Sequence, residues 1–211
     1  MFPDIRVISN NNYVDTNSGV CYSFDDSDMT AYVTENQSRE LAGEIEILSS
    51  ITVDGKTYQV KTISGYAFFG CNKISSFIIP EGITSIEKYA FYGCKGLTSI
   101  TIPESVTNIQ DKTVFSDCSS LTSVTILCPT VGTWFRENKT IENVKLGSTV
   151  KTIENDAFES CSNLKSVTIP DSVTTIEANT FHGCSSLTSV TIGNGVTSIG
   201  SRVFYNCDSL A

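Results

Sequence analysis

The chain has 211 residues, and its 23 acidic residues against 14 basic ones give a net charge of −9. This balance argues against nucleic acid as a partner, because phosphates attract Lys and Arg. Charged residues make up only 18% of the chain, unlike a disordered acidic tail, and no apolar run reaches the roughly 18 residues of a membrane span. The single histidine, His182, excludes mechanisms that need two histidines.

The acidic charge is concentrated near the N-terminus. Residues 1–60 hold ten acidic residues against three basic ones, whereas the rest of the chain holds 13 against 11. Residues 20–24 and 30–34 alternate like half-buried strands, with the turn residues Asp25, Asp26 and Asp28 between them. We therefore expect residues 1–40 to form a small unit of β-hairpin structure.

Residues 51–60 predict a further hairpin. Apolar and polar residues alternate on both sides of Asp54 and Gly55, and Asp-Gly is a preferred two-residue hairpin turn.

From residue 41 onward the chain is a repeat. Each regular unit contains a Leu-x-Ser-Val-x-Ile motif, as at residues 164–169, a second short Val-x-x-Ile motif, and a small-residue–Phe–x–x–Cys segment. The cysteines of these segments are separated by 23, 24, 43, 23 and 23 residues. They are Cys71, Cys94, Cys118, Cys161, Cys184 and Cys207. Such a period predicts a solenoid.

Two units depart from the pattern. One carries an extra residue between Ile109 and Phe115, and the unit of residues 121–140 is only 20 residues long. That short unit lacks the Phe-x-x-Cys element and has Cys128, Pro129 and Trp134 instead. We expect a lost helical turn there, with Trp134 filling the gap.

The spacing predicts what each motif does. Apolar residues two apart indicate a strand, and the proline after it, as at Pro103, ends the ladder. We expect the segment that contains Phe to be a helical or 3₁₀ turn. One coil cannot bury its own apolar face, so coils stack. The fold class is therefore α/β, a right-handed solenoid of about seven coils over residues 41–211 with a parallel sheet, capped by residues 1–40.

The 23-residue unit resembles the BspA-like, treponemal-type leucine-rich repeat family over about residues 41–211. The resemblance implies a curved solenoid with a parallel sheet and a secreted or surface-attached protein that adheres to host proteins or other cells. The unit around Trp134 departs from the family pattern. Fold alone does not fix function.

The outward strand positions are the candidate ligand-binding face. They are small, polar and nearly uncharged, which fits either a solubilising surface or weak, multivalent contacts with protein or glycan rather than one tight pocket. Trp134 is either an exposed anchor of this face or buried filler. The candidate residues are Ser76, Thr98, Ser99, Thr101, Thr122, Ser123, Thr125, Trp134, Glu142, Lys145, Lys165, Ser166, Thr168, Thr188 and Thr191.

Other candidate sites have plainer interpretations. No cysteine pair has zinc-site spacing, so we expect free buried thiols, with a disulfide at Cys21 or Cys128 as the alternative. His182 lacks a recognisable nucleophile motif and is expected to be structural. Asp25, Asp26 and Asp28 lack the glycine and distal glutamate of a calcium loop and are expected to be a solvated turn.

The sequence thus predicts a non-enzymatic extracellular binding or adhesion module without cofactor or metal. The alternative is a structural spacer that displays another domain. An enzyme is disfavoured because no acid–base pair or nucleophile constellation stands out. Residues 1–4 have neither the basic nor the apolar part of a secretory signal. The C-terminal coil is expected to be uncapped, which invites end-to-end self-association.

Overall fold

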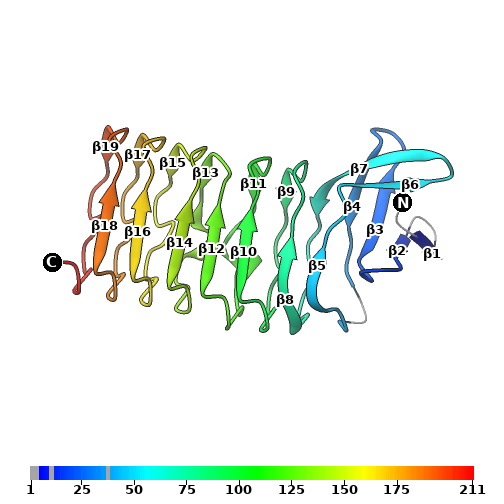
Figure 1. Cartoon of the computed structure of the whole chain (residues 1–211), viewed down its shortest axis with the longest axis horizontal. Helices are drawn as coiled ribbons and strands as arrows, with labels where there is room; N and C mark the ends of the chain where they lie inside the picture. The colour runs from blue at the N-terminus through cyan, green and yellow to red at the C-terminus, as the bar shows by residue number, and fades with distance from the viewer. Residues whose placement is uncertain (1–4, 10–11, 37–38) are drawn as a thin grey trace.

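The computed structural model describes residues 5–9, 12–36 and 39–211. The chain is an elongated stack of coils that runs from a group of N-terminal strands to the C-terminus at the opposite end (Figure 1). Each regular coil contributes one strand to a first sheet and a two-residue strand to a second sheet. The stacked parallel coils confirm the predicted solenoid.

Five parallel strands form the first sheet, in the order β10-β12-β14-β16-β18. Along each inner strand, buried Val, Ile or Leu alternates with an outward polar residue. The strands are the predicted Leu-x-Ser-Val-x-Ile motifs, because β-branched residues pack well on a pleated surface. Their bounds are β10 (Ser99–Ile102), β12 (Ser123–Ile126), β14 (Asn143–Leu146), β16 (Ser166–Ile169) and β18 (Ser189–Ile192).

Short strands form the second face of the stack. Except in the terminal β19, where Ile199 is exposed, each buries one Ile or Val and turns one polar residue outward. Neighbours pair in parallel as β7-β9-β11 and as β13-β15-β17-β19. Their bounds are β9 (Ser85–Ile86), β11 (Asn108–Ile109), β13 (Thr130–Val131), β15 (Thr152–Ile153), β17 (Thr175–Ile176) and β19 (Ser198–Ile199).

The N-terminal strands continue this second face. The first four pair antiparallel in sequence, and the fourth then pairs in parallel with β7 (Lys56–Ile63). The four are β1 (Ile5–Ser9), β2 (Asn12–Asp15), β3 (Cys21–Asp25) and β4 (Thr30–Val33). The boundary at residue 40 and the capping role of this part stay predictions.

The predicted hairpin around Asp54 and Gly55 is confirmed. Strand β6 (Ser50–Val53) pairs antiparallel with β7, and Val53 lies opposite Lys56. Asp54 and Gly55 have φ values of 49° and 76°, the left-handed conformation that a type I′ turn requires. Next to it, β5 (Ala42–Glu46) pairs in parallel with β8 (Lys73–Ile78).

The expected α/β class is not confirmed. Among the described residues there is no α-helix, only two short 3₁₀ segments, η1 (Lys112–Phe115) and η2 (Thr133–Phe135). In the regular coils the residue before the small one takes a left-handed conformation, with φ of 63° at Tyr66 and 61° at Tyr89. This conformation interrupts a right-handed helix, and so short a segment does not nucleate one.

The core holds a continuous column of phenylalanines. Their rings stack between neighbouring coils with centroid separations of 5.1 to 6.2 Å, and the inward placement of Phe is thereby confirmed. The column consists of Phe68, Phe91, Phe115, Phe135, Phe158, Phe181 and Phe204. We call the turns that carry these residues the turn side.

Within the described ranges, no helix is long and apolar enough to cross a membrane.

The irregular unit at residues 121–140 loses length in an unexpected place. Strand β13 begins at Thr130, soon after β12 ends at Ile126, whereas β11 begins at Asn108 after β10 ends at Ile102. The connection between strands is shortened, and the turn survives as η2. The prediction that this unit loses a helical turn is therefore wrong. Trp134 lies in η2, is 8% exposed and fills space in the core, as expected.

Candidate binding face

The outward side of β10, β12, β14, β16 and β18 carries two complete columns of polar residues, which we call the Ser/Thr face. Parallel pairing aligns residues of neighbouring coils directly. The predicted columns are therefore in register. One column is Ser99, Ser123, Asn143, Ser166 and Ser189, and the other is Thr101, Thr125, Lys145, Thr168 and Thr191.

A further predicted column precedes the strands and holds the coils together. Each backbone N–H in it donates to the carbonyl one coil earlier, as from Thr98 to Ser75 at 3.1 Å and from Thr188 to Lys165 at 2.9 Å. The hydroxyls of Thr98, Thr122 and Thr188 donate to the same carbonyls. These hydroxyls are engaged within the chain and are less available to a ligand.

The threonines on the strands are different. Within the described residues, the hydroxyls of Thr101, Thr125 and Thr168 form no hydrogen bond to the chain, and all three are exposed or half-buried. A hydroxyl both donates and accepts. This column therefore offers a flat row of unengaged hydroxyls.

Charge on the face is sparse and mostly paired. Lys165 forms an ion pair with Glu142 of the preceding coil, and Lys145 is exposed between Thr125 and Thr168. Exposed pairs of this kind contribute little to stability. The face is close to neutral, which suits polar partners better than strongly charged ones.

Besides the column that precedes the strands, two further predicted residues lie outside the Ser/Thr face. Ser76 lies on β8, which pairs with β5, and its hydroxyl donates to Glu44 at 3.1 Å. Trp134 lies in η2 on the turn side and is buried. Trp134 therefore cannot serve as an exposed anchor of the Ser/Thr face, because it follows β13 and belongs to the turn side rather than to the first sheet.

The cysteines are all free thiols. Five of them donate to the carbonyl of the phenylalanine one coil earlier, with Sγ–O distances of 3.1 to 3.2 Å. Burial raises their pKa, to about 12 at Cys118 and Cys184. A raised pKa suppresses the reactive thiolate, so these side chains are structural.

The remaining candidates are held by neighbours. His182 is half-buried, with Nδ1 3.3 Å from a Glu159 carboxylate oxygen. Asp26 accepts hydrogen bonds from Lys56 and Tyr58, which lower the pKa of its carboxyl. Across the described residues, no group of His, Cys, Asp or Glu could hold a metal ion.

Sequence reasoning missed an aromatic cluster on the turn side of the first two coils. Tyr66 stacks on Tyr89 with centroids 5.1 Å apart, and Phe69 stacks on Tyr92 at the same distance. The guanidinium of Arg39 lies over Phe69. Tyr66 is 47% exposed. The signal was present, since only these two units have an aromatic residue on both sides of the small-residue–Phe pair.

The repeat itself decides the family. The profile of the BspA type leucine-rich repeat region matches six copies of the unit, over residues 45–133 and 131–211. The chain belongs to this family. The resemblance predicted from the 23-residue unit is thereby confirmed, and no curated protein sequence matches the chain.

Solved structures of similar proteins share this BspA-type architecture. A leucine-rich cell surface protein from Faecalibacterium prausnitzii is 27% identical, with a TM-score of 0.66, over 100% of this chain and 54% of that one. A leucine-rich repeat protein from Eubacterium ventriosum is 26% identical, with a TM-score of 0.75, over 95% and 51%. The T. pallidum leucine-rich repeat protein is 26% identical, with a TM-score of 0.69, over 90% and 87%. This chain thus spans about half the length of the first two.

Proposed function

We infer that the chain is a non-enzymatic binding module of a cell-surface or extracellular protein. It adheres through the Ser/Thr face to a protein or glycan on host cells or neighbouring cells. The observation that carries this proposal is the in-register column of unengaged hydroxyls at Thr101, Thr125 and Thr168. Membership of the BspA-type family supports the surface role, as does the similarity to a cell surface protein.

The flatness of the face determines the kind of contact. Side chains of one column repeat from coil to coil at the strand spacing of about 4.8 Å, so a repetitive or extended ligand can touch several coils at once. Each contact is weak because the face has no large aromatic anchor. Affinity then comes from the number of simultaneous contacts.

A structural spacer is the second candidate. The uninterrupted stack of seven phenylalanine rings makes a stiff rod, and two structural relatives are about twice as long as this chain. In that case the solenoid holds another domain away from the surface, and the Ser/Thr face only keeps the solenoid in solution.

Self-association through the edge strands β18 and β19 stays a prediction.

The test is binding of the purified chain to immobilised matrix proteins, mucins and glycans. The variant that carries Thr101→Glu, Thr125→Glu and Thr168→Glu places three carboxylates on the Ser/Thr face. The matched control carries Thr130→Glu, Thr152→Glu and Thr175→Glu on the second face, where the three residues are also in register.

Saturable binding that the first variant loses by about tenfold or more, and the control retains, supports the proposal. Equal binding by all three proteins would show that the binding site lies outside the Ser/Thr face. Binding to no member of the panel would favour the spacer.

A further inference from the structure

On the turn side, the backbone ladder formed by the residues two after each stacked phenylalanine has one missing rung. In the other coils, the residue two after the stacked phenylalanine donates its N–H to the next coil, as from Gly93 to the Ser116 carbonyl at 2.9 Å and from Ser160 to the His182 carbonyl at 2.7 Å. The corresponding bond from Asp117 to the Arg136 carbonyl is not formed. The two turns therefore separate between residues 115–119 and 136–140.

The thiol row is interrupted at the same place. Three residues after Phe135 stands Asn138, where the other coils have cysteine. Its carboxamide oxygen accepts hydrogen bonds from its own turn, from the N–H of Thr140 at 2.9 Å and of Ile141 at 3.0 Å. In the other inner coils, the phenylalanine carbonyl accepts hydrogen bonds from the next coil's thiol and from the N–H of the residue three positions later. Within the described chain, the Phe115 carbonyl accepts neither of these bonds.

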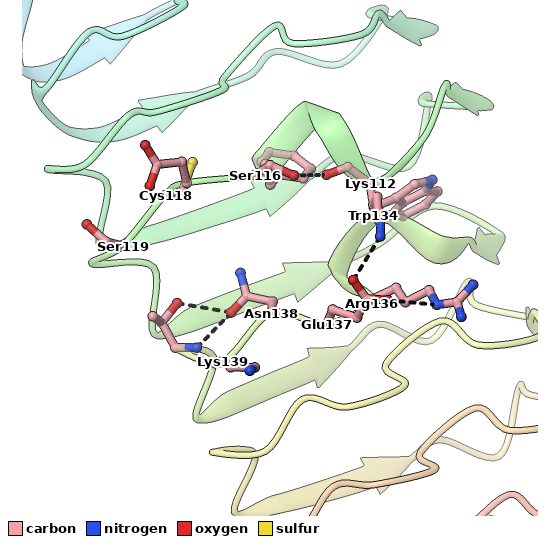
Figure 2. A pocket seen from close by; sticks show the side chains of 12 residues that line it. Lys112, Ser116, Cys118, Ser119, Trp134, Arg136, Glu137, Asn138 and Lys139 are labelled. Atoms are coloured by element: carbon pink, nitrogen blue, oxygen red, sulfur yellow. Dashed lines mark hydrogen bonds and ion pairs between the residues drawn. The ribbon is translucent and has the colours of Figure 1, made fainter.

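A cavity of about 350 Å³ opens between these two turns. Figure 2 shows it, with the Asn138 amide nitrogen pointing into the space between the turns. Trp134, Ser116, Ser119 and Thr140 are among the residues that line it. Phe115 and Cys118 line it as well, although the Phe115 ring is stacked between Phe91 and Phe135 and the Cys118 thiol donates to the Phe91 carbonyl. Its size is that of a small ligand site.

The groups around the cavity suit a ligand with many hydroxyls. The Asp117 N–H is a donor and the Phe115 and Arg136 carbonyls are acceptors without partners in the described chain, and a hydroxyl can satisfy both kinds. Two flanking lysines are paired, with Lys112 2.8 Å from Glu137 and Lys95 3.5 Å from Asp117, while Lys139 lines the cavity without an ion pair in the described chain. Trp134 also lines the cavity, and an aromatic ring suits the C–H surface of a sugar ring.

We propose that this cavity binds one or two residues of a saccharide. The site lies on the turn side and does not depend on the role of the Ser/Thr face. It arises from the shortened unit, which interrupts both the backbone ladder and the thiol row at one position.

The test uses the tryptophan fluorescence of the full chain. Trp134 is the only tryptophan and lines this cavity as well as a second one beside Gly132 and Glu154, so variants in the proposed site are needed to assign a change in its emission. The probes are the methyl glycosides of glucose, galactose, mannose and N-acetylglucosamine. Two variants, called the closing variants, introduce residues that other coils already carry. Ser116→Tyr, as at Tyr92, fills the cavity with a ring, and Asn138→Cys, as at Cys118, supplies the missing thiol donor to the Phe115 carbonyl. Circular dichroism checks that each variant folds.

We expect a saturable change in Trp134 emission with at least one glycoside. Affinity should fall roughly tenfold or more in each closing variant that folds, and should be unchanged in Thr101→Glu on the Ser/Thr face. No saturable change with any probe at millimolar concentration would overturn the proposal. A change of equal affinity in a folded closing variant would overturn it as well.

Discussion

Single side chains that recur from coil to coil form many of the contacts that hold neighbouring coils together. The buried thiols show it best, since five of them donate to the carbonyl of the preceding coil's phenylalanine. A cysteine at this position is small enough for the tight turn and supplies a weak donor. Its recurrence in the sequence predicted the column, but the acceptor carbonyl is visible only once the coils are stacked.

The thiols predict a loss of stability at alkaline pH. Burial raises the pKa of Cys118 and Cys184 to about 12, against an ordinary value of 9.0. The unfolded chain therefore loses these protons first, so the stabilisation is complete below about pH 9 and is lost as the pH rises toward 12. Urea unfolding at about pH 8 and about pH 10.5 should show a lower free energy of unfolding at the higher pH.

The Cys184→Ala variant is the control for this effect. Removing one thiol should reduce the fall by up to about 1.4 kcal/mol per pH unit. A fall of the same steepness in the variant would mean that other groups cause it.

At the scale of the coil, the aromatic column supplies the largest buried contacts. Phe91 stacks between Phe68 and Phe115, with both centroid distances at 5.5 Å. Phe91→Ala should lower the free energy of unfolding by about 3–5 kcal/mol, because the neighbouring coils cannot collapse into the space.

Tyr205→Ala provides the comparison, measured by the same denaturant unfolding. Tyr205 is exposed on the turn side, so its truncation should change the free energy of unfolding by no more than about 0.5 kcal/mol. A cost below about 1 kcal/mol for Phe91→Ala would contradict the inward stacking of this column.

Coil elements differed in how well the sequence predicted them. The first-sheet strands follow from apolar residues two apart, and the repeat fixes their register, so the columns at Thr101 and Thr125 were predictable. The expected α-helical element is absent from the described chain, because a residue in left-handed conformation, such as Tyr66, interrupts each regular turn. The cavity was hidden for another reason: it depends on a backbone bond that fails to form at Asp117, which no residue type announces.

For the molecule as a whole, the stack behaves as a chain of neighbouring interfaces. The interface between the turns at residues 115–119 and 136–140 lacks a backbone bond that its neighbours have, so the Asp117 amide should be less protected than its equivalents in other coils. Hydrogen exchange followed by NMR should find the Asp117 amide faster than those of Gly93 and Ser160. Equal protection at all three positions would contradict the missing rung.

Adhesion through the Ser/Thr face can be measured directly on cells. Beads coated with the chain, with the Thr101→Glu, Thr125→Glu, Thr168→Glu variant, or with the Thr130→Glu, Thr152→Glu, Thr175→Glu control are counted on mucosal epithelial cells and on bacterial cells. We expect the chain and the control to adhere to at least one of these surfaces, and the Ser/Thr-face variant not to adhere. Adhesion by the Ser/Thr-face variant equal to that of the unchanged chain would contradict this expectation.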